Sequence, residues 1–126
     1  MISSAKKRYL FAIYELGENG NEVFSKDIAA SLKVKRSSVS QMLKAIAEDN
    51  LICKEYYGKV QFSEQGARLA NQLYTKYLLL FAFFRKQLQV SEEDARHDAI
   101  LCLCDLSADS VNKISARVLD IKDETE

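Results

Sequence analysis

The chain has 126 residues, of which 48% are hydrophobic and 29% are charged, and its 18 basic and 18 acidic side chains leave a formal net charge of zero. This composition excludes a disordered polar chain, and the length suits one compact domain or two small ones joined closely. The sequence contains no proline and 4 glycines, which indicates a mostly helical chain because these residues interrupt helices.

Basic and acidic side chains are distributed unevenly. Residues 1–62 carry 10 basic and 7 acidic side chains, whereas residues 63–126 carry 8 and 11. This asymmetry suits a nucleic-acid-binding segment joined to another module. The N-terminus lacks the apolar core of a signal peptide, and the most apolar run, residues 77–84, is far shorter than the ~20 residues of a membrane-spanning helix. We therefore expect a cytoplasmic protein.

The first predicted helix begins near Ser3 or Ser4 and ends near Gly17. Residues 17–21 then form a turn, and residues 23–24 form a very short extended segment. The apolar side of this helix consists of Leu10, Ile13, Tyr14 and Leu16.

Two short helices follow, joined by a tight connection at residues 34–36. Ser25 is predicted to cap the first helix, and Ser37 is predicted to cap the second, which runs to about Asn50. The inward residues are Ile28, Ala29 and Leu32 in the first helix, and Val39, Met42, Leu43 and Ile46 in the second. The outward residues of the second helix are Ser37, Ser40, Gln41, Lys44 and Glu48. This arrangement is the helix-turn-helix pattern.

Residues 51–62 change to an extended pattern. Segments 51–55 and 59–62 flank Tyr56-Tyr57-Gly58, which predicts a short β-hairpin. A helix-turn-helix followed directly by a hairpin is a winged helix. We therefore predict a mainly α fold with an N-terminal winged helix-turn-helix and a two-stranded wing.

The remaining sequence is helical. Ser63 is predicted to cap a long helix that ends near Gln87, and further helices begin at Ser91 and Ser107. This predicts a winged-helix DNA-binding domain at residues 1–70 and a helical dimerisation region at residues 71–126. The run 78–84 is apolar on all sides, which favours the core of a homodimer over a pocket for an apolar effector. The predicted dimer interface consists of Leu73, Tyr77, Leu80, Phe81 and Phe84.

The winged helix supplies a set of candidate DNA contacts. Gln41 would bind a base edge, and the lysine, arginine and serine side chains would hold phosphates. The free N–H groups at the start of the helix that carries Ser25 would donate hydrogen bonds to phosphates of the DNA backbone. Tyr57 either contacts a phosphate or the minor groove or packs on the wing. The candidates are Ser25, Lys26, Lys35, Arg36, Ser37, Ser38, Ser40, Gln41, Lys44, Tyr57 and Lys59.

No other group of residues in the sequence predicts a metal-binding or catalytic site. His97, Cys102 and Cys104 do not converge on one point of a helix as a zinc site requires, so two reduced thiols and a surface imidazole are favoured. Glu92, Glu93 and Asp94 are explained by their position at a helix start. We find no paired nucleophile and base and no phosphate-binding loop, and we therefore predict that the chain is not an enzyme.

Several segments, taken in their order along the chain, resemble those of a known family. The segments are residues 8–16, 26–29, 34, 37–43, 51–52, 57–58, 62–66 and 105–107. They resemble the iron- and manganese-dependent repressors, the family of the diphtheria toxin repressor and the manganese transport regulator. The resemblance is specific over residues 9–66, weaker beyond them, and suits the family's short form. It implies a homodimer that binds a palindromic operator of double-stranded DNA and is activated by manganese or iron.

The sequence departs from the family at the metal ligands. The resemblance places ligands at Arg8, Phe11, Tyr77, near Phe81, and at Ile100, Leu103 and Cys104. Arginine cannot bind a cation, phenylalanine, isoleucine and leucine offer no lone pair, and one thiolate does not replace the carboxylates and imidazoles that these metals prefer. We therefore expect no metal cofactor at this site and predict a DNA-binding regulator that divalent metal does not control. The alternatives are an interaction subunit that pairs with a related regulator and a regulator that senses metal through other ligands.

Overall fold

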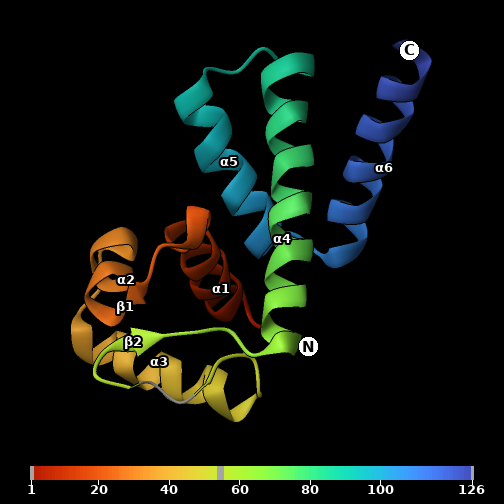
Figure 1. Ribbon diagram of the computed structural model, residues 1–126. Coiled ribbons are helices and arrows are strands. Elements are labelled where there is room, and N and C mark those ends of the chain that lie inside the picture. The colour runs from red at the N-terminus through yellow and green to blue at the C-terminus, as the bar shows by residue number, and fades with distance from the viewer. Residues whose placement is uncertain (1, 54–55, 126) are drawn as a thin grey trace. The chain divides into compact units, whose positions relative to one another are not determined.

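The computed structural model describes residues 2–53 and 56–125, with side chains described as far as residue 120 (Figure 1). The chain forms two compact units, Met1–Asn71 and Gln72–Glu126. The first unit contains α1 (Ser4–Leu16), the 3₁₀ segment η1 (Glu18–Gly20), β1 (Val23–Phe24), α2 (Ser25–Leu32), α3 (Arg36–Glu48), β2 (Lys59–Val60) and the start of α4 (Glu64–Ala82). The rest of α4, the π-helical segment η2 (Phe83–Gln87), α5 (Glu92–Asp105) and α6 (Ala108–Thr125) lie in the second unit. The predicted fold class, a winged helix-turn-helix followed by helices, is confirmed.

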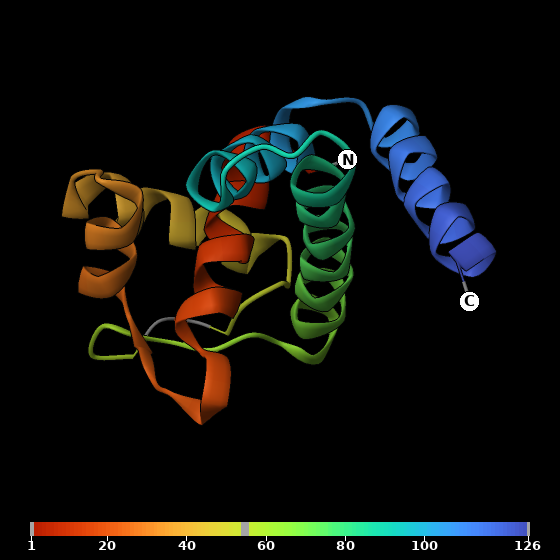
Figure 2. The same ribbon diagram turned by 90° about the horizontal axis from the view of Figure 1, so that it is seen from above.

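Helix α1 has the boundaries that its sequence predicts. The Ser3 hydroxyl accepts a 3.2 Å hydrogen bond from the Lys6 N–H, and the Gly17 N–H donates a 3.0 Å bond to the Ile13 carbonyl. Five consecutive residues, 9–13, are buried, so α1 is enclosed on more than one side. Figure 2 shows the chain turning back after α1 through η1 towards α2.

The helix-turn-helix is present, but its two predicted serine caps are displaced. Phe24, not Ser25, is the N-cap of α2, and the Asp27 carboxylate accepts a 3.3 Å bond from the Phe24 N–H. Helix α3 begins at Arg36 rather than after Ser37, because a 3.1 Å bond from the Val39 N–H to the carbonyl of Lys35 already closes its first turn. In α2 the Asp27 carboxylate in the first turn takes the place of the predicted serine cap. In α3 the N-cap is the extended residue Lys35.

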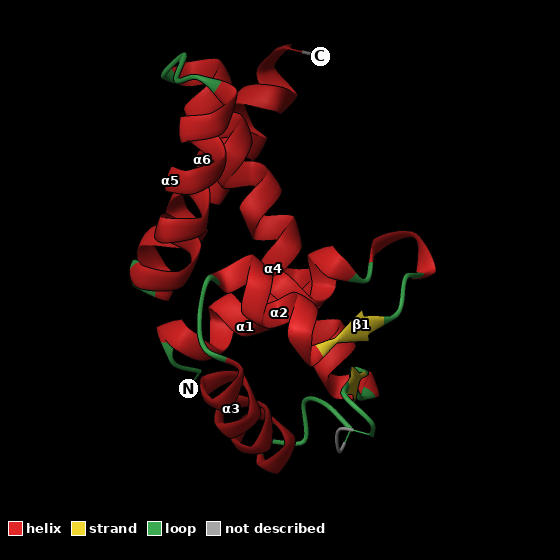
Figure 3. Cartoon of the chain, turned by 90° about the vertical axis from the view of Figure 1, so that its left-hand side faces the viewer, coloured by secondary structure: helices red, strands yellow, loops and turns green. Residues whose placement is uncertain are grey.

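The wing is fastened to the segment before α2. Strand β2 pairs antiparallel with β1, with Val23 opposite Val60 and Phe24 opposite Lys59. Figure 3 shows the two short strands in yellow. The hairpin itself is closed by isolated bridges, Ile52 with Phe62 and Tyr56 with Lys59. The predicted strand at residues 51–55 is therefore paired at single positions, and its residues 54–55 lie outside the described part of the chain.

The core of the first unit gathers apolar side chains from three helices. Helix α1 contacts α2, and α2 contacts α3. Burying each such side chain stabilises the fold by roughly 1.5–3 kcal/mol. The largest fully buried side chains of this unit are Leu10, Ile13, Ile28, Val39, Leu43 and Ile46.

Serine hydroxyls begin the remaining helices, as predicted. Ser63 accepts a 3.0 Å bond from the Gly66 N–H, Ser91 accepts a 3.2 Å bond from the Asp94 N–H, and Ser107 accepts a 3.1 Å bond from the Ser110 N–H. The long helix reaches Gln87, as predicted, but its last five residues, 83–87, have π-helical rather than α-helical geometry. Among the described residues, no helix has both the length and the hydropathy that crossing a membrane requires.

The first turn of α4 is pressed against the chain that leaves α3. A Cβ atom added at Gly66 would lie 1.7 Å from the Leu51 carbonyl oxygen and 2.6 Å from its carbonyl carbon. Both contacts are with backbone, so no side chain can rotate away to make room. Only glycine fits at this position.

We predict that Gly66→Ala destabilises the protein, although the same change inside an ordinary helix stabilises it by about 1 kcal/mol. The added methyl group has to displace backbone, and overpacking of this kind costs about 1–3 kcal/mol. Chemical denaturation measures the free energy of unfolding, with the exposed neighbour Gln65→Ala as control. A Gly66→Ala protein as stable as wild type would show that the helix start is free to move.

Candidate nucleic-acid interface

Helix α3 presents one polar face and one apolar face. Its apolar residues Val39, Leu43 and Ile46 are buried, as predicted, and Met42 is half-buried. The predicted outward residues Ser37, Ser40, Gln41, Lys44 and Glu48 follow the i, i+3, i+4, i+7 spacing that places side chains on one helix face, and Arg36 and Ser38 adjoin them in the first turn. All of them are exposed, namely Arg36, Ser37, Ser38, Ser40, Gln41, Lys44 and Glu48. The predicted recognition surface is therefore a continuous solvent-facing stripe.

The basic side chains of this stripe are not neutralised by the described carboxylates. Within the described ranges, none of Lys35, Arg36 and Lys44 forms an ion pair, whereas Lys6, Arg68 and Lys113 each do. Lys26, at the start of α2, is likewise exposed and unpaired within those ranges. Cations without internal partners are available to phosphate groups, to which they contribute long-range attraction.

The start of α2 offers fewer free donors than its sequence suggested. The Ser25 N–H donates a 2.8 Å bond to the Gly58 carbonyl of the wing, and the Phe24 N–H is satisfied by Asp27. Ser25 itself is half-buried. A backbone contact at this point would depend on Lys26 and on the N–H groups further into the first turn.

The wing places its two predicted contact residues differently. The side chain of Tyr57 is 88% exposed and meets the neighbouring Tyr56 ring edge to face, so most of its surface faces solvent. The Lys59 ammonium lies 3.0 Å from the Glu22 carboxylate, which partly neutralises it. Sequence reasoning missed Glu22 because its proximity to Lys59 follows from the pairing of β1 with β2, and a two-residue strand carries no signal of its partner.

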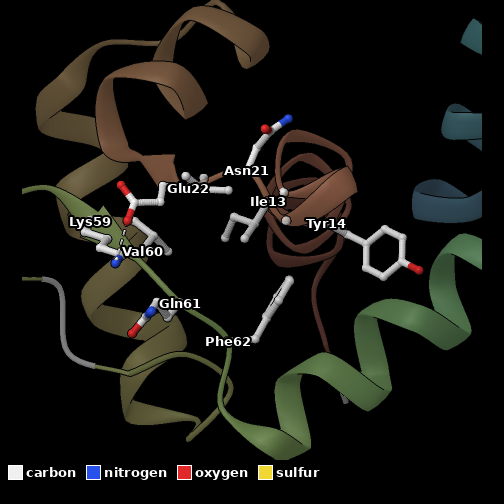
Figure 4. Close-up of a pocket in the computed structure, with 11 residues that line it drawn as sticks. Ile13, Tyr14, Asn21, Glu22, Lys59, Val60, Gln61 and Phe62 are labelled. Carbon is white, nitrogen blue, oxygen red and sulfur yellow. Dashed lines mark hydrogen bonds and ion pairs between the residues drawn. The ribbon is translucent and has the colours of Figure 1, made fainter.

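A groove of about 600 Å³ lies between the end of α1 and the wing (Figure 4). Ile13 and Phe62 face it from the two sides, and the Glu22–Lys59 ion pair lies at its rim. Because these two charges already satisfy each other, the rim presents no unpaired charge to a ligand. The groove is lined by Ile13, Tyr14, Gly17, Gly20, Asn21, Glu22, Val23, Lys59, Val60, Gln61 and Phe62.

In the first unit, two of the positions that the resemblance assigns to metal ligands lie on α1. Phe11 is buried and Arg8 is half-buried. One is an apolar ring and the other a cation, so neither fits a divalent metal ion.

The other positions of this kind lie in the second unit. Tyr77, Leu103 and Cys104 are buried and Ile100 is half-buried. The Arg96 guanidinium donates a 3.3 Å hydrogen bond to the Tyr77 hydroxyl, which joins α4 to α5. Among the described residues no group of three His, Cys, Asp or Glu side chains is placed to hold a metal ion. The donor set does not fit manganese or iron, which prefer carboxylate and imidazole ligands.

The His97, Cys102 and Cys104 side chains are not brought together. His97 is exposed, with its Nδ1 atom 3.3 Å from an Asp98 carboxylate oxygen, whereas Cys104 is buried. All three cysteines, including the exposed Cys53, are free thiols. Burial, and then the negative charge of Asp98, raise the pKa of the Cys102 thiol above its usual value.

The predicted dimer-interface residues are mostly covered within a single chain. Leu73, Tyr77 and Leu80 are buried, and Phe81 and Phe84 are half-buried. Among the described side chains of the second unit, the large apolar ones that remain exposed are other leucines. These are Leu78, Leu88, Leu101, Leu106 and Leu119.

Comparison with known proteins agrees with this arrangement. Residues 1–60 match the family model described as "Iron dependent repressor, N-terminal DNA binding domain". The HTH-type transcriptional regulator MntR of Geobacillus thermodenitrificans is 30% identical over 98 residues, which are 78% of this chain and 69% of that protein. MntR of Bacillus velezensis is 27% identical over 124 residues, 98% of this chain and 87% of that protein.

Solved structures share the fold as well. The manganese regulator SloR superposes with a TM-score of 0.74 at 26% sequence identity. The match covers 90% of this chain and 53% of the SloR chain, so the present chain spans about half the length of that regulator.

We predict that the three thiols react with an alkylating reagent in the order of their exposure. At pH 8, Cys53 should react faster than Cys102, because Cys53 is exposed and because the raised pKa of Cys102 lowers the fraction of its nucleophilic thiolate. Cys104 should react last because it is buried. Mass spectrometry of timed samples measures the order, and unfolded protein serves as control. Equal rates in the folded protein would contradict this prediction.

Proposed function

The chain belongs to the iron-dependent repressor family of DNA-binding transcription regulators, and we propose that it acts as a homodimeric repressor that binds a palindromic operator without control by divalent metal. The observation that carries this proposal is the exposed stripe on α3, where unpaired cations flank Gln41 inside the matched DNA-binding domain. Regulators of this family are not enzymes.

The roles of the contact residues follow from their chemistry. Lys35, Arg36 and Lys44 hold phosphates and set the register of α3 in the major groove, while the Gln41 amide binds a base edge, preferably adenine. The exposed serines Ser37, Ser38 and Ser40 donate shorter hydrogen bonds to the backbone. Lys26 contacts the flanking phosphates from the start of α2.

Dimerisation through the second unit would present two winged helices to the two halves of the operator. A symmetric dimer binds symmetric DNA because each half-site meets an identical surface. The half-buried Phe81 and Phe84, together with the exposed leucines, provide apolar area for this contact. Occupation of a promoter by such a dimer excludes other proteins and represses transcription.

Metal independence is supported by the residues at the expected ligand positions. Phe11, Ile100 and Leu103 contribute packing rather than ligation, and full burial of a side chain such as Phe11 or Leu103 is worth roughly 1.5–3 kcal/mol. The Tyr77 hydroxyl accepts a hydrogen bond from Arg96, an exposed and permanently charged side chain. The regulator is therefore held in one state by its own side chains.

We predict that the protein enriches specific duplexes from a random-sequence DNA library in the presence of a chelator. Added Mn²⁺, Fe²⁺ or Zn²⁺ should leave the affinity for an enriched duplex within about twofold, a change of only ~0.4 kcal/mol. Fluorescence anisotropy measures the affinity in each condition. Binding only with metal would show that other ligands sense it, and no binding under any condition would favour an interaction subunit that pairs with a related regulator.

Replacing Lys44 by alanine should weaken binding to all duplexes, because one phosphate contact is lost. The slope of the logarithm of the binding constant against the logarithm of the salt concentration should become less steep by about 1. Gln41→Ala should instead relax preference at one base pair and leave the salt dependence unchanged. Lys113→Ala is the matched control, since Lys113 lies on α6 and pairs with Asp109 at 3.2 Å. If Lys113→Ala weakened DNA binding as much as Lys44→Ala, the assignment of α3 to the DNA interface would be contradicted.

A further inference from the structure

The tip of the wing holds a tyrosine in a backbone conformation that is unfavourable for that residue. Tyr56 and Lys59 exchange backbone hydrogen bonds of 3.2 Å and 2.9 Å across a two-residue turn. The residues between them, Tyr57 and Gly58, have φ angles of +50° and +80°. Hairpin turns with positive φ at both positions favour asparagine, aspartate or glycine at the first. Tyrosine strains the backbone there because its Cβ approaches a carbonyl oxygen.

The strained turn does not bury its tyrosine side chains. The side chains of Tyr56 and Tyr57 are 71% and 88% exposed, more than any other large apolar side chain described. Their rings meet edge to face, with centroids 4.5 Å apart and planes inclined by 76°. Strain that the fold does not require and aromatic surface that the fold does not bury both point to a ligand outside the chain.

The turn is held firmly behind its tip. The Gly58 carbonyl accepts the 2.8 Å bond from the Ser25 N–H, and Lys59 is paired with Phe24 in the sheet. The hairpin therefore leaves the start of α2 in a fixed direction. In Figures 1 and 3 the wing and α3 lie at the same end of the first unit. The exposed Tyr56 and Tyr57 side chains therefore lie on the wing, at the end of the first unit that also carries α3.

We propose that the Tyr56–Tyr57 pair is a wedge that stacks against bases in the minor groove next to the half-site contacted by α3, with Tyr57 as the inserting ring and Tyr56 bracing it. This inference rests on the proposed DNA-binding function and adds a determinant of sequence preference to it. Apolar and aromatic wedges unstack base steps, and pyrimidine–purine steps yield most easily. The wing should therefore select a flexible step, such as TA, at a fixed distance from the α3 site.

Two substitutions at Tyr57 distinguish stacking of its ring from contacts made by its hydroxyl group and from effects of backbone strain. Tyr57→Asn places a favoured residue at the first turn position, so it relieves the strain while removing the ring. Tyr57→Phe keeps the ring and removes only the hydroxyl group. We expect Tyr57→Asn to unfold at an unchanged or higher temperature and yet to bind DNA about fivefold or more weakly, as loss of a stacked ring implies. We expect Tyr57→Phe to bind like wild type.

The DNA probe is a duplex enriched by the wild-type chain, with 2-aminopurine placed at successive positions outside the α3 site. Because this base brightens when it is unstacked, wild type and Tyr57→Phe should raise its emission at one step in each flank, and Tyr57→Asn should not. Selection with Tyr57→Asn should also lose the preference for a flexible step there.

Several results would overturn the wedge. If Tyr57→Phe loses as much affinity as Tyr57→Asn, the hydroxyl group contacts a phosphate and nothing is stacked. If Tyr57→Asn binds like wild type, or lowers the unfolding temperature, the ring serves the fold or another partner. In these cases the wild-type chain still binds its duplex, so the proposed function stands. A wild-type chain that enriches no duplex removes both the function and the wedge.

Discussion

The close approach of Gly66 to the Leu51 carbonyl is the constraint on which the winged helix depends. Around it, the Ser63 hydroxyl donates a 2.6 Å bond to the Asn50 carbonyl and accepts the Gly66 N–H, while the Ser63 N–H donates a 3.1 Å bond to Leu51. The end of α3 and the start of α4 are thereby joined at one point. The intervening chain has to leave and return there, so it projects as a wing whose base is closed by the Ile52–Phe62 bridge.

This closure relates the two parts of the candidate interface. Helix α3 is set by its buried face, and the wing is set by the junction at Ser63 and by β1. The start of α2 is tied to the wing through Ser25 and Gly58. Contacts proposed for α2, α3 and the wing are consequently carried by one body, with little freedom for one to adjust without the others.

Much of this arrangement could be predicted from the sequence where a local signal exists. The spacing of Val39, Leu43 and Ile46 defines the polar face of α3, and the hydroxyls of Ser3, Ser63 and Ser91 begin helices as expected. Features that depend on distant partners could not be predicted. The β1–β2 pairing, the Glu22–Lys59 ion pair and the contact at Gly66 each join segments far apart in the chain. The displaced caps at Ser25 and Ser37 show that a hydroxyl yields to a better-placed carboxylate or to an earlier helical turn.

The pairing of Val23 with Val60 also has a consequence for how the protein comes to be folded. Closing a loop of this length costs conformational entropy before the sheet returns any stabilisation, so two-residue strands cannot nucleate it. The local contacts of α1, α2 and α3 should form first and bring the two strands together. On a ribosome, the wing would therefore be completed only after the first turn of α4 had left the exit tunnel, and a nascent chain halted before that point would carry α3 without the rest of its DNA-binding surface.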